Sequence, residues 1–184
     1  TKPVHNREWG AANFQAVVDA LSPHVAFVQV GGERPLVRGG RPLPNLAGLP
    51  VREAASLFAV CDAVLTQEGG LGHLARAADA RAIVIFGGSL LPEQTGYPEC
   101  VNMWSRPECS PCFGSGANCP HLKCMVPLTP RRVAAALAEL LETRGGFRIP
   151  REAPAAAPDR WTPPEFVDRA RLEAELRRSP PSSR

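Results

Sequence analysis

The chain has 184 residues, of which 44% are hydrophobic and 21% charged, an ordinary composition for a globular domain with one core. Its net charge of +3, with positive and negative residues interspersed, excludes the basic footprint of proteins that bind nucleic acid or anionic lipid. No apolar run approaches the ~20 residues that a membrane-spanning helix needs, so we expect no membrane span.

Apolar periodicity predicts helices and strands that alternate along the chain. Helices are predicted over residues 13–21, 51–60 and 71–78, and from Thr129-Pro130 to the glycines at 145–146. Short buried strands are predicted over residues 25–30, 63–66 and 82–86. This alternation is typical of a parallel sheet with helices on both faces, so the predicted fold class is α/β, Rossmann-like.

The composition changes near Pro150, where Pro, Ala and Arg become frequent. We therefore predict a domain over residues 1–149, followed over 150–184 by a Pro/Ala-rich linker, a charged helix at 165–178 and a disordered tail. The first residues contain neither an initiator Met nor a signal peptide, and the chain is expected to be the C-terminal portion of a longer protein.

A glycine-rich turn is expected where the strand at 63–66 meets the following helix; residues 66–73 read Thr-Gln-Glu-Gly-Gly-Leu-Gly-His. In open parallel sheets ligands bind beyond the carboxyl ends of the strands, and a helix N-terminus there offers unpaired N–H groups to a pyrophosphate. Glu68 is suited to accept hydrogen bonds from sugar hydroxyls, and His73 to donate to a phosphate. The spacing alone leaves an alternative to ligand binding: a glycine-rich structural turn whose histidine is hydrogen-bonded within the protein.

The order of motifs resembles glycosyltransferase family 9, the ADP-heptose transferases. The resemblance covers roughly residues 1–145 and rests on Glu68-Gly-Gly-Leu-Gly-His-Leu-Ala, Ile83-Val-Ile-Phe-Gly-Gly-Ser, Pro92 and Gly96-Tyr97. Those enzymes have an Asp-Thr-Gly-x-x-His-Leu-Ala loop, and later a strand leading to Phe-Gly-Pro-Thr. The resemblance implies a GT-B architecture of two Rossmann-like domains, of which this chain is similar to the second, donor-binding one.

The resemblance also implies a donor-binding set, namely Arg7, Glu33, Glu68, Gly69, Gly70, Gly72 and His73. Arg7 stands near the position of a family lysine that neutralises the donor diphosphate, and it keeps that charge. Without the resemblance, Arg7 reads as a solvated surface cation and Glu33, the candidate for ribose hydroxyls, as an exposed loop residue.

Three departures from the family pattern bear on this site: Glu68 replaces Asp, Gly69 replaces Thr, and Gly88-Ser89 replaces Pro-Thr, so contacts from that last loop are expected to differ. Gln67, Thr95 and Tyr97 are neighbouring polar candidates, and Tyr97 reads equally well as a packing aromatic.

The resemblance predicts a transferase that moves a sugar, heptose from ADP-heptose, to a saccharide or protein hydroxyl. In the family the catalytic base that deprotonates the acceptor is an Asp of the N-terminal domain, so no catalytic residue is assigned here. The expected protein partner of this chain is a missing N-terminal GT-B half or a second copy of the chain. The alternative is a non-catalytic, metal-stabilised Rossmann-like binding or assembly module.

Four of the six cysteines, Cys109, Cys112, Cys119 and Cys124, lie in one short stretch. A CxxC turn with a second pair nearby can complete a tetrahedron of thiolates that selects one zinc or iron ion. Two disulfides, a redox-active CxxC and a ligand role for His121 are the alternatives. The clustering favours a reducing compartment, and we predict the cytoplasm. The autotransporter heptosyltransferases of the family have a comparable cluster, which implies a structural iron site within a loop at 105–128.

Overall fold

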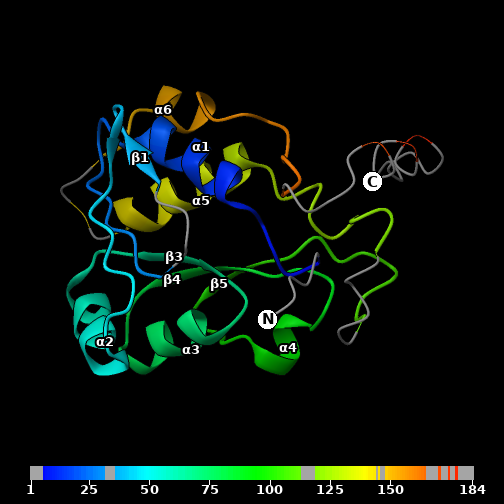
Figure 1. The fold of residues 1–184 in the computed structure, drawn as a ribbon, viewed down its shortest axis with the longest axis horizontal. Helices are drawn as coiled ribbons and strands as arrows, with labels where there is room; N and C mark the ends of the chain where they lie inside the picture. Colours follow the sequence, from blue (N-terminus) through cyan, green and yellow to red (C-terminus); the bar gives the residue numbers. More distant parts are fainter. Residues whose placement is uncertain are drawn as a thin grey trace.

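The computed structural model describes residues 6–31, 36–112, 119–143, 145 and 148–164, together with residues 170, 174 and 177. A three-stranded parallel sheet lies between two layers of helices (Figure 1). Its strands, in spatial order, are β3 (Val64–Gln67), β4 (Ala82–Ile85) and β5 (Val101–Met103). This arrangement confirms the predicted α/β, Rossmann-like fold class.

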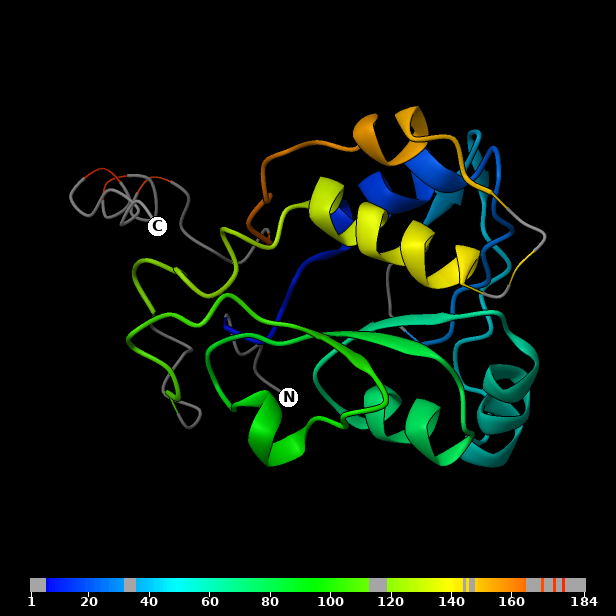
Figure 2. The ribbon, with the colours of Figure 1, turned by 180° about the vertical axis from the view of Figure 1, so that it is seen from behind.

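The helices divide between the two faces of the sheet (Figures 1 and 2). One layer contains α1 (Ala11–Leu21), α5 (Pro130–Glu142) and α6 (Glu152–Ala155). The other contains α2 (Val51–Val60), α3 (Gly70–Ala77) and α4 (Pro92–Thr95). A small antiparallel hairpin, β1 (Val37–Arg38) and β2 (Arg41–Pro42), lies beside the first layer. Among the described residues, no helix is both long and apolar enough to cross a membrane.

The central strand β4 is buried along its whole length because both of its faces are covered. Ile83 and Ile85 belong to the core on the α1 and α5 side, whereas Ala82 and Val84 belong to the core on the α3 side. The alternation follows the two-residue period of a strand, and a strand covered on both faces is apolar at every position.

The start of α5 agrees with its prediction. The Thr129 hydroxyl accepts a hydrogen bond from the N–H of Arg132 at 3.4 Å, and Pro130 occupies the first turn, where its missing N–H is not needed. The helix ends at Glu142, shortly before Gly145, whose φ of 78° suits glycine.

The strand predicted at residues 25–30 is wrong. In this described stretch the β-pairing is an isolated bridge between Gln29 and Asn45, in which Gln29 N–H donates to Pro44 O and Gln29 O accepts from Leu46 N–H. Residues along this stretch alternate between half-buried and exposed instead of being fully buried, and Val28 is 44% exposed. Strand β5, which pairs with β4, was not predicted from the sequence.

The segment predicted as a linker is packed where the structure describes it. Ile149, Ala153, Ala157 and Trp161 are buried in the same core as α1 and α5. The N–H of Thr162 also donates to Asn13 Oδ1 at 2.8 Å. The linker prediction is therefore wrong for residues 150–162, because small residues there fit against the helical layer. The charged helix at 165–178 and the predicted tail lie largely outside the described residues.

Candidate functional site

The N-terminal segment at residues 6–9 crosses the carboxyl ends of β3 and β4. Asn6 O accepts a hydrogen bond from Gly88 N–H at 3.1 Å, just beyond β4. Gln67 Oε1, at the end of β3, accepts from Trp9 N–H at 3.0 Å, and Gln67 Nε2 donates to a Glu8 carboxylate oxygen at 3.0 Å. These contacts hold Arg7, which lies between Asn6 and Glu8, at the strand ends.

The glycine-rich turn leads directly from β3 into α3. Gly69 has a φ of 146°, which an L side chain rarely adopts, and it precedes the first helical residue, Gly70. Its carbonyl accepts from Gly72 N–H at 3.0 Å and His73 N–H at 3.4 Å. The N–H groups that precede these two in the chain belong to the first turn of α3. Such groups have no acceptor within the helix, and this end of the helix carries the positive end of its dipole. The turn therefore presents unpaired donors at the mouth of the sheet.

Gly72 lies where α3 packs on the sheet. A Cβ at this position would lie 3.5 Å from a Val84 methyl group, an ordinary van der Waals contact. Gly72 itself is buried. The helix N-terminus is thus held directly over β4.

Glu68 is a buried carboxylate at the end of β3, with a side chain only 5% exposed. Its Oε1 lies 3.8 Å from Arg7 Nε, and among the described residues its buried Oε2 has no hydrogen-bond partner. Burial raises the pKa of Glu68, and the neighbouring Arg7 guanidinium lowers it by less. A buried carboxylate oxygen without a donor is costly, so this group is ready to accept hydrogen bonds from a ligand.

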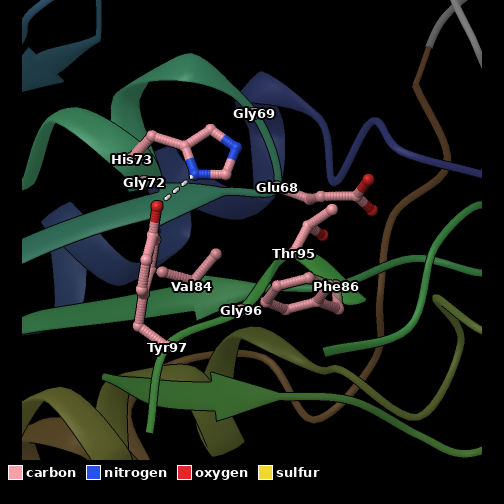
Figure 3. Close-up of a pocket in the computed structure, with 9 residues that line it drawn as sticks. All are labelled: Glu68, Gly69, Gly72, His73, Val84, Phe86, Thr95, Gly96 and Tyr97. Carbon is pink, nitrogen blue, oxygen red and sulfur yellow. Dashed lines mark hydrogen bonds between the residues drawn. The ribbon is translucent and has the colours of Figure 1, made fainter. Parts of the chain in front are cut away.

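Figure 3 shows the pocket in front of this turn, with two polar ends. At one end the Glu68 carboxylate lies beside Thr95, whose buried Oγ1 also lacks a partner within the described chain. At the other end Tyr97 Oη and His73 Nδ1 are hydrogen-bonded at 2.9 Å. The lining residues are Glu68, Gly69, Gly72, His73, Val84, Phe86, Thr95, Gly96 and Tyr97.

The space in the pocket is about 230 Å³, including its opening to solvent. Because this volume includes open solvent, the pocket is a shallow depression that does not enclose a ligand. A nucleotide sugar would lie across its mouth.

Residues 37–123 match the family model of glycosyltransferase family 9 (heptosyltransferase). The matched segment contains the whole turn from Glu68 to His73 and the other end of the pocket at Tyr97. It ends before Cys124 and begins after Arg7. The similarity to family 9 supports a glycosyltransferase function. A search of curated proteins and a search of solved structures each found no match.

The structure brings together most, but not all, of the predicted donor-binding residues. Glu68, Gly69, Gly72 and His73 line one pocket, and Arg7 lies against Glu68. Gly70 does not line the pocket, and Glu33 lies outside the described residues.

Of the neighbouring polar candidates, Thr95 and Tyr97 line the pocket, whereas Gln67 anchors the N-terminal segment. Asn6 was not among the predicted site residues; it is fully buried and holds Gly88 through its carbonyl. Its only sequence signal was its position directly before Arg7.

The cysteine cluster lies around Gly88, on the loop after β4. A Cβ at Gly88 would lie 3.3 Å from Cys124 Sγ and 3.4 Å from Cys112 Sγ, so both sulfurs face the glycine. Gly88 O also accepts from the N–H of Cys112 at 2.7 Å and from the hydroxyl of Ser110 at 3.1 Å. The cysteine loop is therefore bound to the same loop that Asn6 holds.

The thiol of Cys124 is buried. Its pKa is raised to about 12, mainly by burial and to a smaller extent by the neighbouring Cys119, Cys109 and Cys112, while a hydrogen bond from the Gly88 backbone lowers it. None of the cysteines is in a disulfide. Cys119 Sγ lies 3.7 Å from His121 Nδ1. No group of three or more His, Cys, Asp or Glu side chains within the described ranges is arranged to hold a metal ion. The metal site stays a prediction.

Proposed function

We propose that this chain is the donor-binding part of a glycosyltransferase that uses a nucleotide sugar. The observation that carries the proposal is the buried carboxylate of Glu68, with an oxygen that lacks a donor, next to the N-terminus of α3. A sugar diphosphate offers both groups that such a site needs: hydroxyl donors for the carboxylate, and an anion for the helix N-terminus.

The two ends of the pocket suggest how the donor lies. The end with Glu68 and Thr95 accepts hydrogen bonds and fits the sugar ring, while a phosphate there would be repelled by the carboxylate. The first turn of α3 and His73 provide N–H donors for the diphosphate. The Arg7 side chain, 38% exposed and 3.8 Å from Glu68, adds a positive charge beside the carboxylate. Following the family match, we propose ADP-heptose as the donor.

The chemistry of transfer needs more than this pocket. Neutralisation of the departing diphosphate can come from the α3 N-terminus, His73 and Arg7, but a base must take the proton of the acceptor hydroxyl. We propose that the base and the acceptor site, for a saccharide or protein hydroxyl, belong to a separate N-terminal half or a second copy. The six cysteines outside disulfides favour a reducing compartment, and we place the protein in the cytoplasm.

Calorimetric titration of the purified chain with ADP, ADP-heptose, UDP and GDP tests the proposal. Binding of ADP or ADP-heptose with higher affinity than UDP or GDP is the expected result. A chain that binds none of them favours the alternative of a non-catalytic binding or assembly module.

Replacing Glu68 by Gln is expected to weaken binding of the sugar nucleotide by about 10- to 100-fold, because hydrogen bonds to a charged acceptor contribute about 1.5–3 kcal/mol. The folded protein should keep its stability or gain some at neutral pH. The raised pKa of Glu68 means that the wild type loses stability as the pH rises through that pKa, whereas Gln does not titrate. Titration calorimetry and urea unfolding at neutral and acid pH measure both effects.

Glu93→Gln is the matched control, since Glu93 is an exposed carboxylate on the neighbouring helix α4 and does not line the pocket. It should leave affinity and stability unchanged. Equal affinities of the Glu68→Gln variant and the wild type for ADP-heptose would rule out a role of this carboxylate in binding the sugar.

We also propose that Cys109, Cys112, Cys119 and Cys124 hold one iron or zinc ion with a structural role. What supports this is the chemistry of the donor set: two of the four sulfurs face Gly88, which leaves them room, and the thiols are close enough to shift the pKa of Cys124. Four sulfur ligands would fill the coordination sphere and leave no position for a substrate water. The ion would cross-link the cysteine loop, which lies beside Gly88 of the loop after β4.

Cys109→Ser is expected to reduce the bound metal well below one ion per chain and to lower Tm by about 4–8 °C, equivalent to about 2 kcal/mol. Elemental analysis and thermal unfolding measure these effects. Cys61→Ser, at a cysteine outside the cluster, should change neither. A metal content unaffected by Cys109→Ser, or a wild-type chain without metal, contradicts the four-cysteine site.

A further inference from the structure

Tyr97 and His73 reach the pocket from different elements and meet at its edge (Figure 3). His73 lies in the first turns of α3, and Tyr97 follows α4. Tyr97 Oη and His73 Nδ1 are 2.9 Å apart, and the rings contact edge to face with centroids 5.7 Å apart. The contact therefore fixes both the position and the orientation of the imidazole.

The backbone of Tyr97 is itself held in place. Its carbonyl accepts hydrogen bonds from Asn102 Nδ2 at 2.8 Å and from Cys100 N–H at 3.1 Å. The preceding Gly96 has no room for a side chain, since a Cβ would lie 2.6 Å from Pro92 O. The Tyr97 ring also packs against the core on the α3 side of the sheet. The phenol is thus preorganised by β5 and by the turn after α4.

The position of the protons on Tyr97 and His73 determines whether His73 can donate a hydrogen bond to an anion. A neutral imidazole has one N–H donor and one acceptor nitrogen, and the bond that one nitrogen makes selects the state of the other. A phenol that donates to Nδ1 leaves the proton on Nε2. Within the described chain Nε2 makes no hydrogen bond, so this donor remains for a ligand.

We propose that Tyr97 is a positioning residue: its hydroxyl donates to His73 Nδ1 and thereby keeps Nε2–H as the donor to a diphosphate oxygen of the nucleotide. The inference rests on the proposed function. In the opposite tautomer, the lone pair of Nε2 would face the phosphate and repel it. Tyr97 stabilises the productive tautomer before the ligand arrives, which reduces the cost of binding.

Tyr97→Phe is the decisive variant, because it removes the hydroxyl and keeps the ring that packs against His73 and the core. We expect the affinity for ADP to fall about 3- to 10-fold, as for loss of one hydrogen bond. Unfolding stability should change little. The ¹⁵N chemical shifts of the His73 ring in the ligand-free protein should move from an Nε2–H tautomer in the wild type to a mixture in the variant.

A double-mutant cycle separates positioning from a direct contact of Tyr97 with the ligand. In a His73→Ala background, Tyr97→Phe should have no further effect on ADP affinity, because its action passes through the imidazole. Additive effects, or unchanged His73 shifts in Tyr97→Phe, would overturn the positioning role while leaving donor binding intact. A wild-type chain that binds neither ADP nor ADP-heptose, with the same tautomer, would instead contradict the proposed function.

Discussion

Replacing Trp161 by Ala is expected to lower the free energy of unfolding by about 3–5 kcal/mol, the usual cost of removing a buried Trp. The side chain is 3% exposed, and its Nε1–H donates to Trp9 O at 3.0 Å. Trp9 is itself fully buried and donates through Nε1 to Leu128 O at 2.7 Å. The substitution would therefore leave a large cavity between α1 and the C-terminal segment.

Urea unfolding followed by circular dichroism measures this loss, and Trp161→Phe is the matched variant. Phe keeps most of the buried surface and loses only the hydrogen bond, so it should cost about 1 kcal/mol in addition to a small packing defect. A change below about 1 kcal/mol for Trp161→Ala would be the behaviour of an exposed linker residue, and it would contradict the packing of residues 149–162.

Gly87→Ala is expected to destabilise the chain by about 3 kcal/mol and to weaken nucleotide binding as well. A Cβ at Gly87 would lie 1.5 Å from Asn6 O and 2.9 Å from Met125 Cε. Because backbone cannot give way as a flexible side chain can, the segment at residues 6–9 must move off the strand ends. That movement would carry Arg7 away from Glu68. Urea unfolding and titration with ADP measure the two effects.

Gly70→Ala is the control for this substitution. Gly70 lies in α3, has no atom within 4 Å of an added Cβ, and is not among the glycines with positive φ. Ala is favoured over Gly in a helix by up to about 1 kcal/mol, so the variant should be as stable as the wild type or more stable. A Gly87→Ala chain with wild-type stability would contradict the close crossing of Asn6 over Gly87.

The burial of the Glu68 carboxylate costs folding free energy, which fits a ligand-binding residue and not a stabilising ion pair. Its distance of 3.8 Å from Arg7 is long, and burial outweighs the guanidinium in shifting its pKa. A carboxylate retained for stability alone would be expected to have its oxygens satisfied by the protein. Functional sites commonly keep groups that destabilise the free fold.

The sequence by itself determined the elements whose signals are local. Helix α2 formed over the predicted residues, and α5 began at the predicted Thr129 cap. The strand ends before Glu68 and Gly87 were predicted to within one residue, because a short apolar run followed by glycines depends on neighbouring residues only. From these ends, the glycine-rich turn could be placed at the mouth of the sheet.

Only the tertiary structure decided which distant residues meet there. The segment at 25–30 has strand-like composition but makes one bridge. Residues 150–162 have linker-like composition but pack in the core with α1 and α5. In both segments burial depends on surfaces that other parts of the chain supply. The same holds for the contacts of Asn6 with Gly88 and Tyr97 with His73. Hydrogen bonds between residues far apart in sequence leave no periodic pattern, so they emerge only when the layers are assembled.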